Sequence, residues 1–335
     1  MSKIQKEIKQ AVKKHYIFLV LGLVIISPIV IEGFMTPVSA TTLTYKPVVG
    51  AVTDSSAAIY ARTDASSKLQ VLYGTSQSLS GATVTPSEPI LTDVSHDFVG
   101  HVFLSDLSPD TKYYYSVVVD GVKSDVLSFT TFPINSTVKD FSFAVFSDSI
   151  INGKTTSYVK AGEDNPAFVM QLGDFPHSDP ASISTAIDNW WASNKSAVMS
   201  SFYGPHYTNS TSIPFVHIWD DHDYGANNAN KRAKWKATST QAFLDYYPIY
   251  NRPNPAGGLW HSFRYAQAEF FILDLRSQKD STQSVDDVNH SMLAGDPISN
   301  DQKTWFKNAL LNSTATWKFV ASSLSWNPTV PKNEA

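Results

Sequence analysis

The sequence predicts an all-β sandwich followed by an α/β layered domain, because the pattern of apolar residues changes once along the chain. Between residues 45 and 133, short apolar runs alternate with turns that contain Asp, Ser and Gly, which is typical of antiparallel strands. From residue 138 onwards, apolar strands alternate with longer helical stretches, which is typical of α/β folds. We therefore expect a β-sandwich domain over residues 41–134 and an α/β domain over residues 138–335.

The segment before the sandwich is typical of exported proteins. Lysines among the first 14 residues precede an almost wholly apolar run from Ile17 to Ile31, and Val-Ser-Ala at 38–40 suits a signal peptidase. The apolar run is short for a bilayer span, which needs about 20 residues. We expect residues 1–40 to be a signal peptide, with an uncleaved membrane anchor at residues 16–31 as the alternative. Either way, the remainder of the chain is expected to be secreted or extracytoplasmic.

The composition limits the available chemistry. The 335-residue chain has a formal net charge of -4 and contains no cysteine. The lack of a basic surplus argues against specific nucleic-acid recognition, and membrane contact is expected only through an uncleaved N-terminal segment. Without cysteine, the side chains available to bind metal ions are carboxylates, imidazoles and amides.

The N-terminal region is predicted to contain short strands and no catalytic cluster. The apolar runs lie at residues 48–52, 57–61, 69–73, 101–104 and 116–119. The segment from Leu107 to Tyr115 resembles the corner before strand F of fibronectin type III-like sandwiches, where a tyrosine hydroxyl bonds to nearby backbone. Because no polar cluster stands at a strand end in this region, we expect a structural module.

The C-terminal region is predicted to alternate between strands and helices. Strands are expected at residues 141–146, 167–172, 214–219, 269–273 and 317–321, and helices at residues 183–199, 233–246 and 299–311. Ser299 and Gln302 have the spacing of a capping box at the start of the last helix.

Aspartates follow successive predicted strands of this region. They are Asp148, Asp174, Asp220 with Asp221, and Asp274. A single aspartate after a strand is usually a turn former or helix cap. However, residues at the carboxyl ends of α/β strands line a common crevice, and one of these ends carries the whole run Asp-Asp-His-Asp at 220–223.

Carboxylates that converge at one edge of a sheet require cations. Oxygen ligands of this kind suit Mg²⁺, Mn²⁺, Ca²⁺ or iron. The pattern therefore predicts a two-metal site that hydrolyses an anionic ester, with one aspartate between the metals and a metal-bound hydroxide as nucleophile.

These motifs resemble those of the metallophosphoesterases, specifically the PhoD-like alkaline phosphatases and phosphodiesterases. The resemblance is carried by Leu-Gly-Asp at 172–174, Trp-Asp-Asp-His-Asp-Tyr-Gly at 219–225 and Leu-Asp-Leu-Arg at 273–276. It covers the chain from Tyr45 to its end, and a β-sandwich before the catalytic domain also fits the family. The resemblance implies an exported phosphoesterase that acts on phosphate mono- or diesters at a dinuclear site containing Fe, Ca, Mg, Mn or Zn.

The resemblance also assigns roles to individual residues. It implies that Asp148, Asp174 and Asp221 are metal ligands, with Asp174 between two ions. It implies that His222 contacts a phosphoryl oxygen or protonates the leaving group. It implies that Arg276 clamps the phosphate.

Alternatives remain for the neighbouring polar residues. A structural pair with Asp274 is the alternative for Arg276. Asp220 and Asp223 are expected to hold His222 or adjacent backbone rather than to bind metal.

One motif of the family is absent from the sequence. The family completes its site with late histidines in a Gly-Asp-x-His motif, but nothing similar follows Trp317, and the last histidine is His290. We expect the chain to be truncated at its C-terminus. The rival hypotheses are a hydrolase of another anionic ester, and a non-catalytic secreted or surface binding protein with a degenerate phosphoesterase domain.

Overall fold

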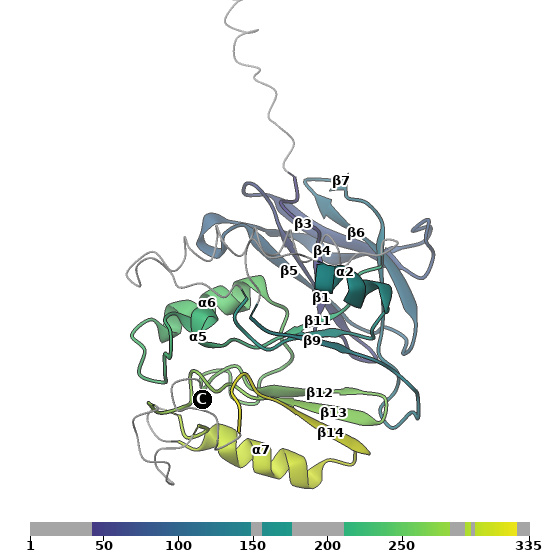
Figure 1. The fold of residues 1–335 in the computed structure, drawn as a ribbon. Coiled ribbons are helices and arrows are strands. Elements are labelled where there is room, and N and C mark those ends of the chain that lie inside the picture. Colours follow the sequence, from purple (N-terminus) through teal and green to yellow (C-terminus); the bar gives the residue numbers. More distant parts are fainter. Residues whose placement is uncertain (1–41, 149–155, 176–210, 282–291, 296–298, 327–335) are drawn as a thin grey trace, which may run out of the picture. The chain divides into compact units, whose positions relative to one another are not determined.

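The computed structural model describes residues 42–148, 156–175, 211–281, 292–295 and 299–326 (Figure 1). Contacts between residues divide the chain into the segment Met1–Ala40 and the unit Thr41–Ala335, and all of the described residues belong to the second. The expected signal or anchor segment and the helix expected at 183–199 lie outside the described residues. Among the residues that are described, no helix combines the length and the apolar character needed to cross a bilayer.

The N-terminal strands fall into two sheets. β1 (Val48–Gly50), β2 (Ala57–Arg62) and β5 (Val99–Leu104) belong to one sheet. The other sheet contains β3 (Lys68–Gly74), β4 (Thr83–Leu91), β6 (Lys112–Val119), β7 (Val122–Lys123) and β8 (Leu127–Thr130). Strands are therefore present wherever the sequence predicts them in this region, while β4, β7 and β8 are additional.

β4 escapes sequence prediction because it contains Pro86 and Pro89. Proline cannot donate a ladder hydrogen bond, so it is confined to edge strands or strand ends. β4 is at an edge, since it pairs only with β3 in the order β4-β3-β6-β7. Within the segment Leu107 to Tyr115, the backbone N–H of Ser108 donates to the hydroxyl of the buried Tyr113 at 2.8 Å.

The C-terminal region contains a parallel set of strands and a second, smaller sheet. β9 (Ala144–Phe146), β10 (Val169–Gln171) and β11 (Phe215–His217) are parallel neighbours, and α2 (Thr156–Glu163) connects the first two. The smaller sheet contains β12 (His261–Tyr265), β13 (Ala268–Ile272) and β14 (Trp317–Ala321), with α7 (Asp301–Asn312) alongside it (Figure 1). α6 (Lys236–Tyr246) matches the helix expected there, whereas β12 is a strand that the sequence does not predict.

The N-terminal and C-terminal regions share one sheet. β1 pairs with β11 in parallel, with Gly50 opposite Phe215, and the six strands run in the order β5-β2-β1-β11-β10-β9. Glycine is required at position 50 because a Cβ there would lie 2.6 Å from the carbonyl oxygen of Phe215. The strand that precedes the Asp-Asp-His-Asp run is therefore held on both sides by the sheet.

The capping box predicted for α7 is wrong. Asn300 stands at the start of the helix without a side-chain cap, and Gln302 faces inward. The side chain of Gln302 instead binds both backbone groups of Asp274, accepting from its N–H at 2.8 Å and donating to its carbonyl at 2.9 Å. Burial decides the outcome, since Gln302 is fully buried and must satisfy its amide inside the protein.

Candidate metal centre

Three aspartates are brought to one edge of the shared sheet by the register of its parallel strands. Gln171 at the end of β10 is opposite both Phe146 of β9 and His217 of β11. The chain continues from these aligned ends into Asp148, Asp174 and Asp220. Their proximity is thus a consequence of strand pairing rather than of sequence neighbourhood.

The centre is formed by two carboxylates and one imidazole. Ligand-capable atoms of Asp174, Asp221 and His222 all lie within 4.8 Å of one another, and these residues are only 5%, 5% and 8% exposed. The backbone N–H of His222 also donates to Oδ1 of Asp174 at 3.2 Å, which joins two segments that are distant in sequence. Carboxylate oxygen and imidazole nitrogen form a donor set that suits divalent and trivalent metal ions.

The electrostatics of Asp174 fit a bound cation. Burial raises the pKa of Asp174 to about 9, with further contributions from the carboxylates of Asp223, Asp220, Asp221 and Asp148. Negative charge on all of these groups is costly in a buried site unless a cation compensates it. The residues present therefore fit a metal ion.

The backbone around Asp174 adopts left-handed conformations that place its side chain. Gly173 has φ 102°, and Asp174 and Asp148 have φ 52° and 55°. Aspartate tolerates this region better than most residues. Glycine is required at position 173 for a second reason: a Cβ there would lie 2.5 Å from Cβ of Asp220 and 2.9 Å from its Cα.

Replacing Gly173 with alanine is therefore expected to displace Asp220 and to weaken metal binding. A left-handed alanine alone costs about 1–2 kcal/mol. Gly121→Ala is the matched control, because Gly121 has φ 85° and open space around its Cβ position. We expect a greater loss of unfolding free energy and of metal content in Gly173→Ala than in the control. Equal losses in the two variants would show that contact with Asp220 does not matter.

Asp148 is at the same edge but outside the group of three. It is exposed, its backbone N–H donates to the carbonyl of Gly173 at 3.2 Å, and its carboxylate contributes to the raised pKa of Asp174. Of the predicted ligands, the structure thus groups Asp174 and Asp221, together with His222, and places Asp148 on the neighbouring strand end.

The short helix α5 (Asp221–Tyr224) begins shortly after β11, and its first residues belong to the Asp-Asp-His-Asp run at 220–223. Oδ2 of Asp223 accepts from the backbone N–H of Asp220 at 3.1 Å, and Oδ1 accepts from that of Phe175 at 3.0 Å. Asp223 therefore holds backbone on both sides of the centre, as the sequence predicts.

Arg276 is paired with the aspartates of this helix start and not with Asp274. Its Nε donates to Oδ1 of Asp220, and its Nη2 lies 3.4 Å from Oδ1 of Asp221. The side chain is buried, with the whole residue 3% exposed, yet Nη1 has no hydrogen-bond partner among the described residues. A buried guanidinium with a free donor beside a metal site can receive an anionic oxygen.

Sequence reasoning missed Lys279, which lies one turn after Arg276. The N–H of Lys279 donates to the carbonyl of Leu275 at 2.7 Å, and the residue is buried. Burial, followed by the charge of Arg276, lowers the pKa of Lys279 to about 8, while Asp220 and Asp221 oppose this shift. The available signal was the spacing of two basic residues in Arg-Ser-Gln-Lys.

Asp274 does not join the centre. Its carboxylate is fully buried and accepts hydrogen bonds from Trp219, Leu259 and Ser277. A strand-end position alone therefore does not determine where an aspartate points.

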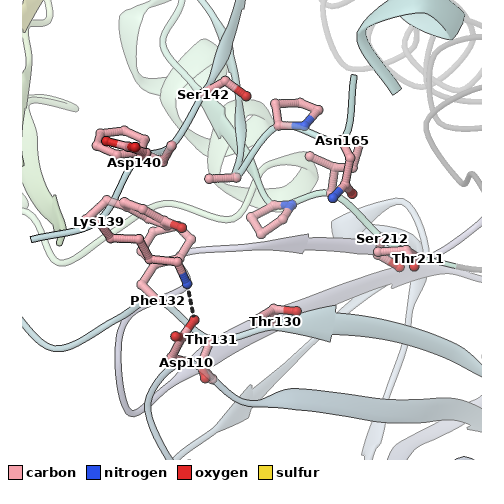
Figure 2. Close-up of a pocket in the computed structure, with 16 residues that line it drawn as sticks. Asp110, Thr130, Thr131, Phe132, Lys139, Asp140, Ser142, Asn165, Thr211 and Ser212 are labelled. Carbon is pink, nitrogen blue, oxygen red and sulfur yellow. Dashed lines mark hydrogen bonds and ion pairs between the residues drawn. The ribbon is translucent and has the colours of Figure 1, made fainter. Parts of the chain in front are cut away.

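A cavity of about 390 Å³ lies at the opposite ends of the parallel strands (Figure 2). It is lined by Ser142, Ala167 and Pro214, which precede β9, β10 and β11, and Lys139 and Asp110 form an ion pair of 2.6 Å in its wall. The buried hydroxyls that line it are already satisfied by the protein. Thr131 donates to the carbonyl of Ser108, and Ser212 bonds to the hydroxyl of Tyr115. This cavity is separate from the metal centre.

Comparison with known proteins supports these findings. The family model described as PhoD-like phosphatase matches residues 143–335, and the one described as the N-terminal domain of purple acid phosphatase matches residues 46–131. Alkaline phosphatase D of Bacillus subtilis (strain 168) is 26% identical over 264 residues, which is 68% of this chain and 45% of that protein. The chain therefore spans about half the length of this curated relative.

Two solved structures share the fold. The structure described as that of PhoD superposes with a TM-score of 0.64 at 20% identity, covering 83% of this chain and 61% of the other. Purple acid phosphatase PPD1 from yellow lupin (Lupinus luteus) seeds superposes with a TM-score of 0.56 at 13% identity, covering 84% and 50%. At these identities the likeness shows the fold alone.

Proposed function

The chain belongs to the PhoD-like phosphatase family, and we propose on this basis that it is a metal-dependent phosphoesterase acting on phosphate mono- or diesters. The observation that carries the proposal is the cluster of Asp174, Asp221 and His222 beside Nη1 of Arg276, which has no hydrogen-bond partner in the described part of the chain. It combines ligands for a cation with a donor for the phosphate that the cation would polarise.

We propose that the centre would hold two metal ions and that Asp148, Asp174 and Asp221 would be their carboxylate ligands. The contribution of Asp148 to the raised pKa of Asp174 supports its facing the same site. Fe, Ca, Mg, Mn and Zn are all compatible with carboxylate ligands. A bound metal ion would polarise the phosphoryl oxygen and lower the pKa of water. Side chains of the protein would bind the phosphoryl group and protonate the leaving oxygen.

The proposed role of Arg276 is to bind a phosphoryl oxygen through Nη1 while Asp220 and Asp221 hold its other nitrogens. The proposed role of His222 is to contact the phosphoryl group or to protonate the leaving oxygen. The imidazole starts from a backbone that is fixed on Asp174, so little reorganisation is needed. Lys279 would add positive charge near Asp220 and Asp221.

Domain division and export are part of the same proposal. We divide the chain into a fibronectin III-like sandwich at 41–134 and an α/β layered catalytic domain at 138–335, which is supported by the separate ranges of the two family matches. Export is supported by the basic and apolar pattern of residues 1–40.

Hydrolysis of a chromogenic phosphate monoester and diester tests the proposal. We expect turnover of at least one ester, its loss after treatment with a chelator, and its return when one of the five metal ions is added. A protein that hydrolyses neither ester after every metal addition, or whose turnover is insensitive to the chelator, contradicts the proposal.

His222→Asn separates the two roles open to this residue within the same assay. If His222 acts on the phosphoryl or leaving group, the variant keeps its metal content and kcat falls by about 10²–10⁴-fold. Loss of metal together with activity would instead show that His222 is a ligand.

A further inference from the structure

Asp274 accepts hydrogen bonds from donors that come from three separate parts of the chain. Oδ1 accepts from Nε1 of Trp219 at 2.7 Å and from the N–H of Ser277 at 3.0 Å. Oδ2 accepts from the N–H of Leu259 at 2.9 Å and from the hydroxyl of Ser277. None of these donors is charged, so the carboxylate organises backbone and neutral side chains around itself.

The sequence positions of these donors connect Asp274 with the metal centre. Trp219 directly precedes Asp220, and Ser277 directly follows Arg276. The carboxylate of Asp274 thus joins the chain neighbours of both members of the Arg276–Asp220 ion pair. Any rotation of Asp274 would be transmitted to both sides of this pair.

Asp274 is itself held in place through its backbone. Gln302 of α7 binds its backbone N–H and carbonyl. Gly258 leaves the space that the carboxylate needs, since a Cβ there would lie 2.6 Å from Oδ2. Hydrogen bonds therefore connect α7, through Asp274, with the residues next to the metal centre. The residues that form them, Gln302, Asp274, Trp219 and Ser277, are all buried.

We propose that Asp274 is a positioning residue that holds Trp219 and Ser277 so that Arg276 keeps two nitrogens on Asp220 and Asp221 and presents Nη1 to the phosphate. This inference rests on the proposed phosphoesterase function. A carboxylate is needed because it accepts on both oxygens. In Asp274→Asn, an amide NH₂ would face either the pair of donors on Oδ1 or the pair on Oδ2.

The test measures inhibition by inorganic phosphate in Asp274→Asn, together with kcat and metal content. We expect the inhibition constant of phosphate to rise about tenfold or more, which corresponds to about 1.4 kcal/mol, while metal content stays at the wild-type level. Asp245→Asn is the matched control, because Asp245 is a buried, hydrogen-bonded aspartate on α6. It is expected to leave phosphate inhibition unchanged.

A double-mutant cycle distinguishes positioning from a general effect on folding. In the Arg276→Lys background, Asp274→Asn is expected to raise the phosphate inhibition constant by less than twofold, because the guanidinium group that Asp274 positions is already absent. If the double variant instead shows the product of the two single-variant increases in the phosphate inhibition constant, the positioning role of Asp274 is overturned. If Asp274→Asn does not fold, Ser277→Ala removes one donor at the same junction and is measured in the same cycle.

Different measurements contradict the proposed phosphoesterase function and the positioning role of Asp274. A wild-type protein that hydrolyses neither ester after every metal addition contradicts the proposed function itself. If the wild-type protein hydrolyses an ester and is inhibited by inorganic phosphate, unchanged phosphate inhibition in Asp274→Asn and in Ser277→Ala contradicts only the positioning role.

Discussion

Replacing Asp174 with asparagine is expected to abolish phosphate-ester hydrolysis and, at the same time, to stabilise the metal-free protein. Asp174 is one of the two carboxylates of the candidate metal centre, and an amide is a far weaker metal ligand. We expect turnover to fall by at least about 10³-fold, as for loss of a major electrostatic contributor. The metal-free protein gains stability because a buried carboxyl group among four other carboxylates is removed.

The sign and size of the stability change follow from the pKa of Asp174. Its folded-state pKa is raised from 3.8 to about 9, so stability present below pH 3.8 is lost progressively as the pH rises through 9. At pH 7 this loss is up to about 4 kcal/mol. Asp174→Asn should recover it at pH 7, and the gain should shrink towards pH 4.

Denaturant unfolding in the presence of a chelator, at several pH values, measures this gain. Asp125→Asn is the control, because Asp125 is an exposed aspartate away from the centre. A variant of Asp174 that is less stable than the wild type at pH 7 without metal, or that retains hydrolysis, would refute the account of this carboxylate.

Arg276→Ala is expected to have the second-largest effect, on both stability and activity. Removing the guanidinium leaves Asp220 without its partner in a largely buried position, which costs about 3–5 kcal/mol in comparable pairs. It also removes the hydrogen-bond donor that we propose binds the phosphate, so we expect kcat/KM to fall by about 10²–10³-fold. Arg276→Lys should retain part of the stability but lose the fork that binds two partners at once.

The matched control is Arg264→Ala on β12. Arg264 forms a 3.0 Å ion pair with Glu269, but it is more exposed than Arg276. We expect a loss of about 0–1 kcal/mol and unchanged turnover. If Arg276→Ala behaves like this control, then neither its pairing nor its proposed role in phosphate binding is supported.

The strands were largely predictable from local sequence, whereas their pairing was not. Alternating apolar runs indicated β1, β2, β3, β5 and β6, because side chains of a strand point alternately to its two faces. The parallel pair of β1 with β11 joins residues 50 and 215, and nothing in either segment encodes its partner. The membership of both regions in one sheet was therefore visible only in the structure.

The site was predictable to a similar extent. The positions after β10 and β11 correctly indicated that Asp174 and Asp221 lie together, because parallel strands of one sheet end at a common edge. Asp274 follows β13, which belongs to the smaller sheet with β12 and β14, so the same rule could not place it. The partner of Arg276 was likewise set by tertiary packing, since Asp220 is 56 residues away in sequence.

The position of a metal ion in crystals of the active protein, measured by anomalous scattering after loading with Mn²⁺, tests the candidate metal centre itself. We expect an anomalous peak within coordination distance of the carboxylates of Asp174 and Asp221, and no such peak in Asp174→Asn. Active, metal-loaded crystals with no peak at these carboxylates, or with the ion bound elsewhere, would contradict it.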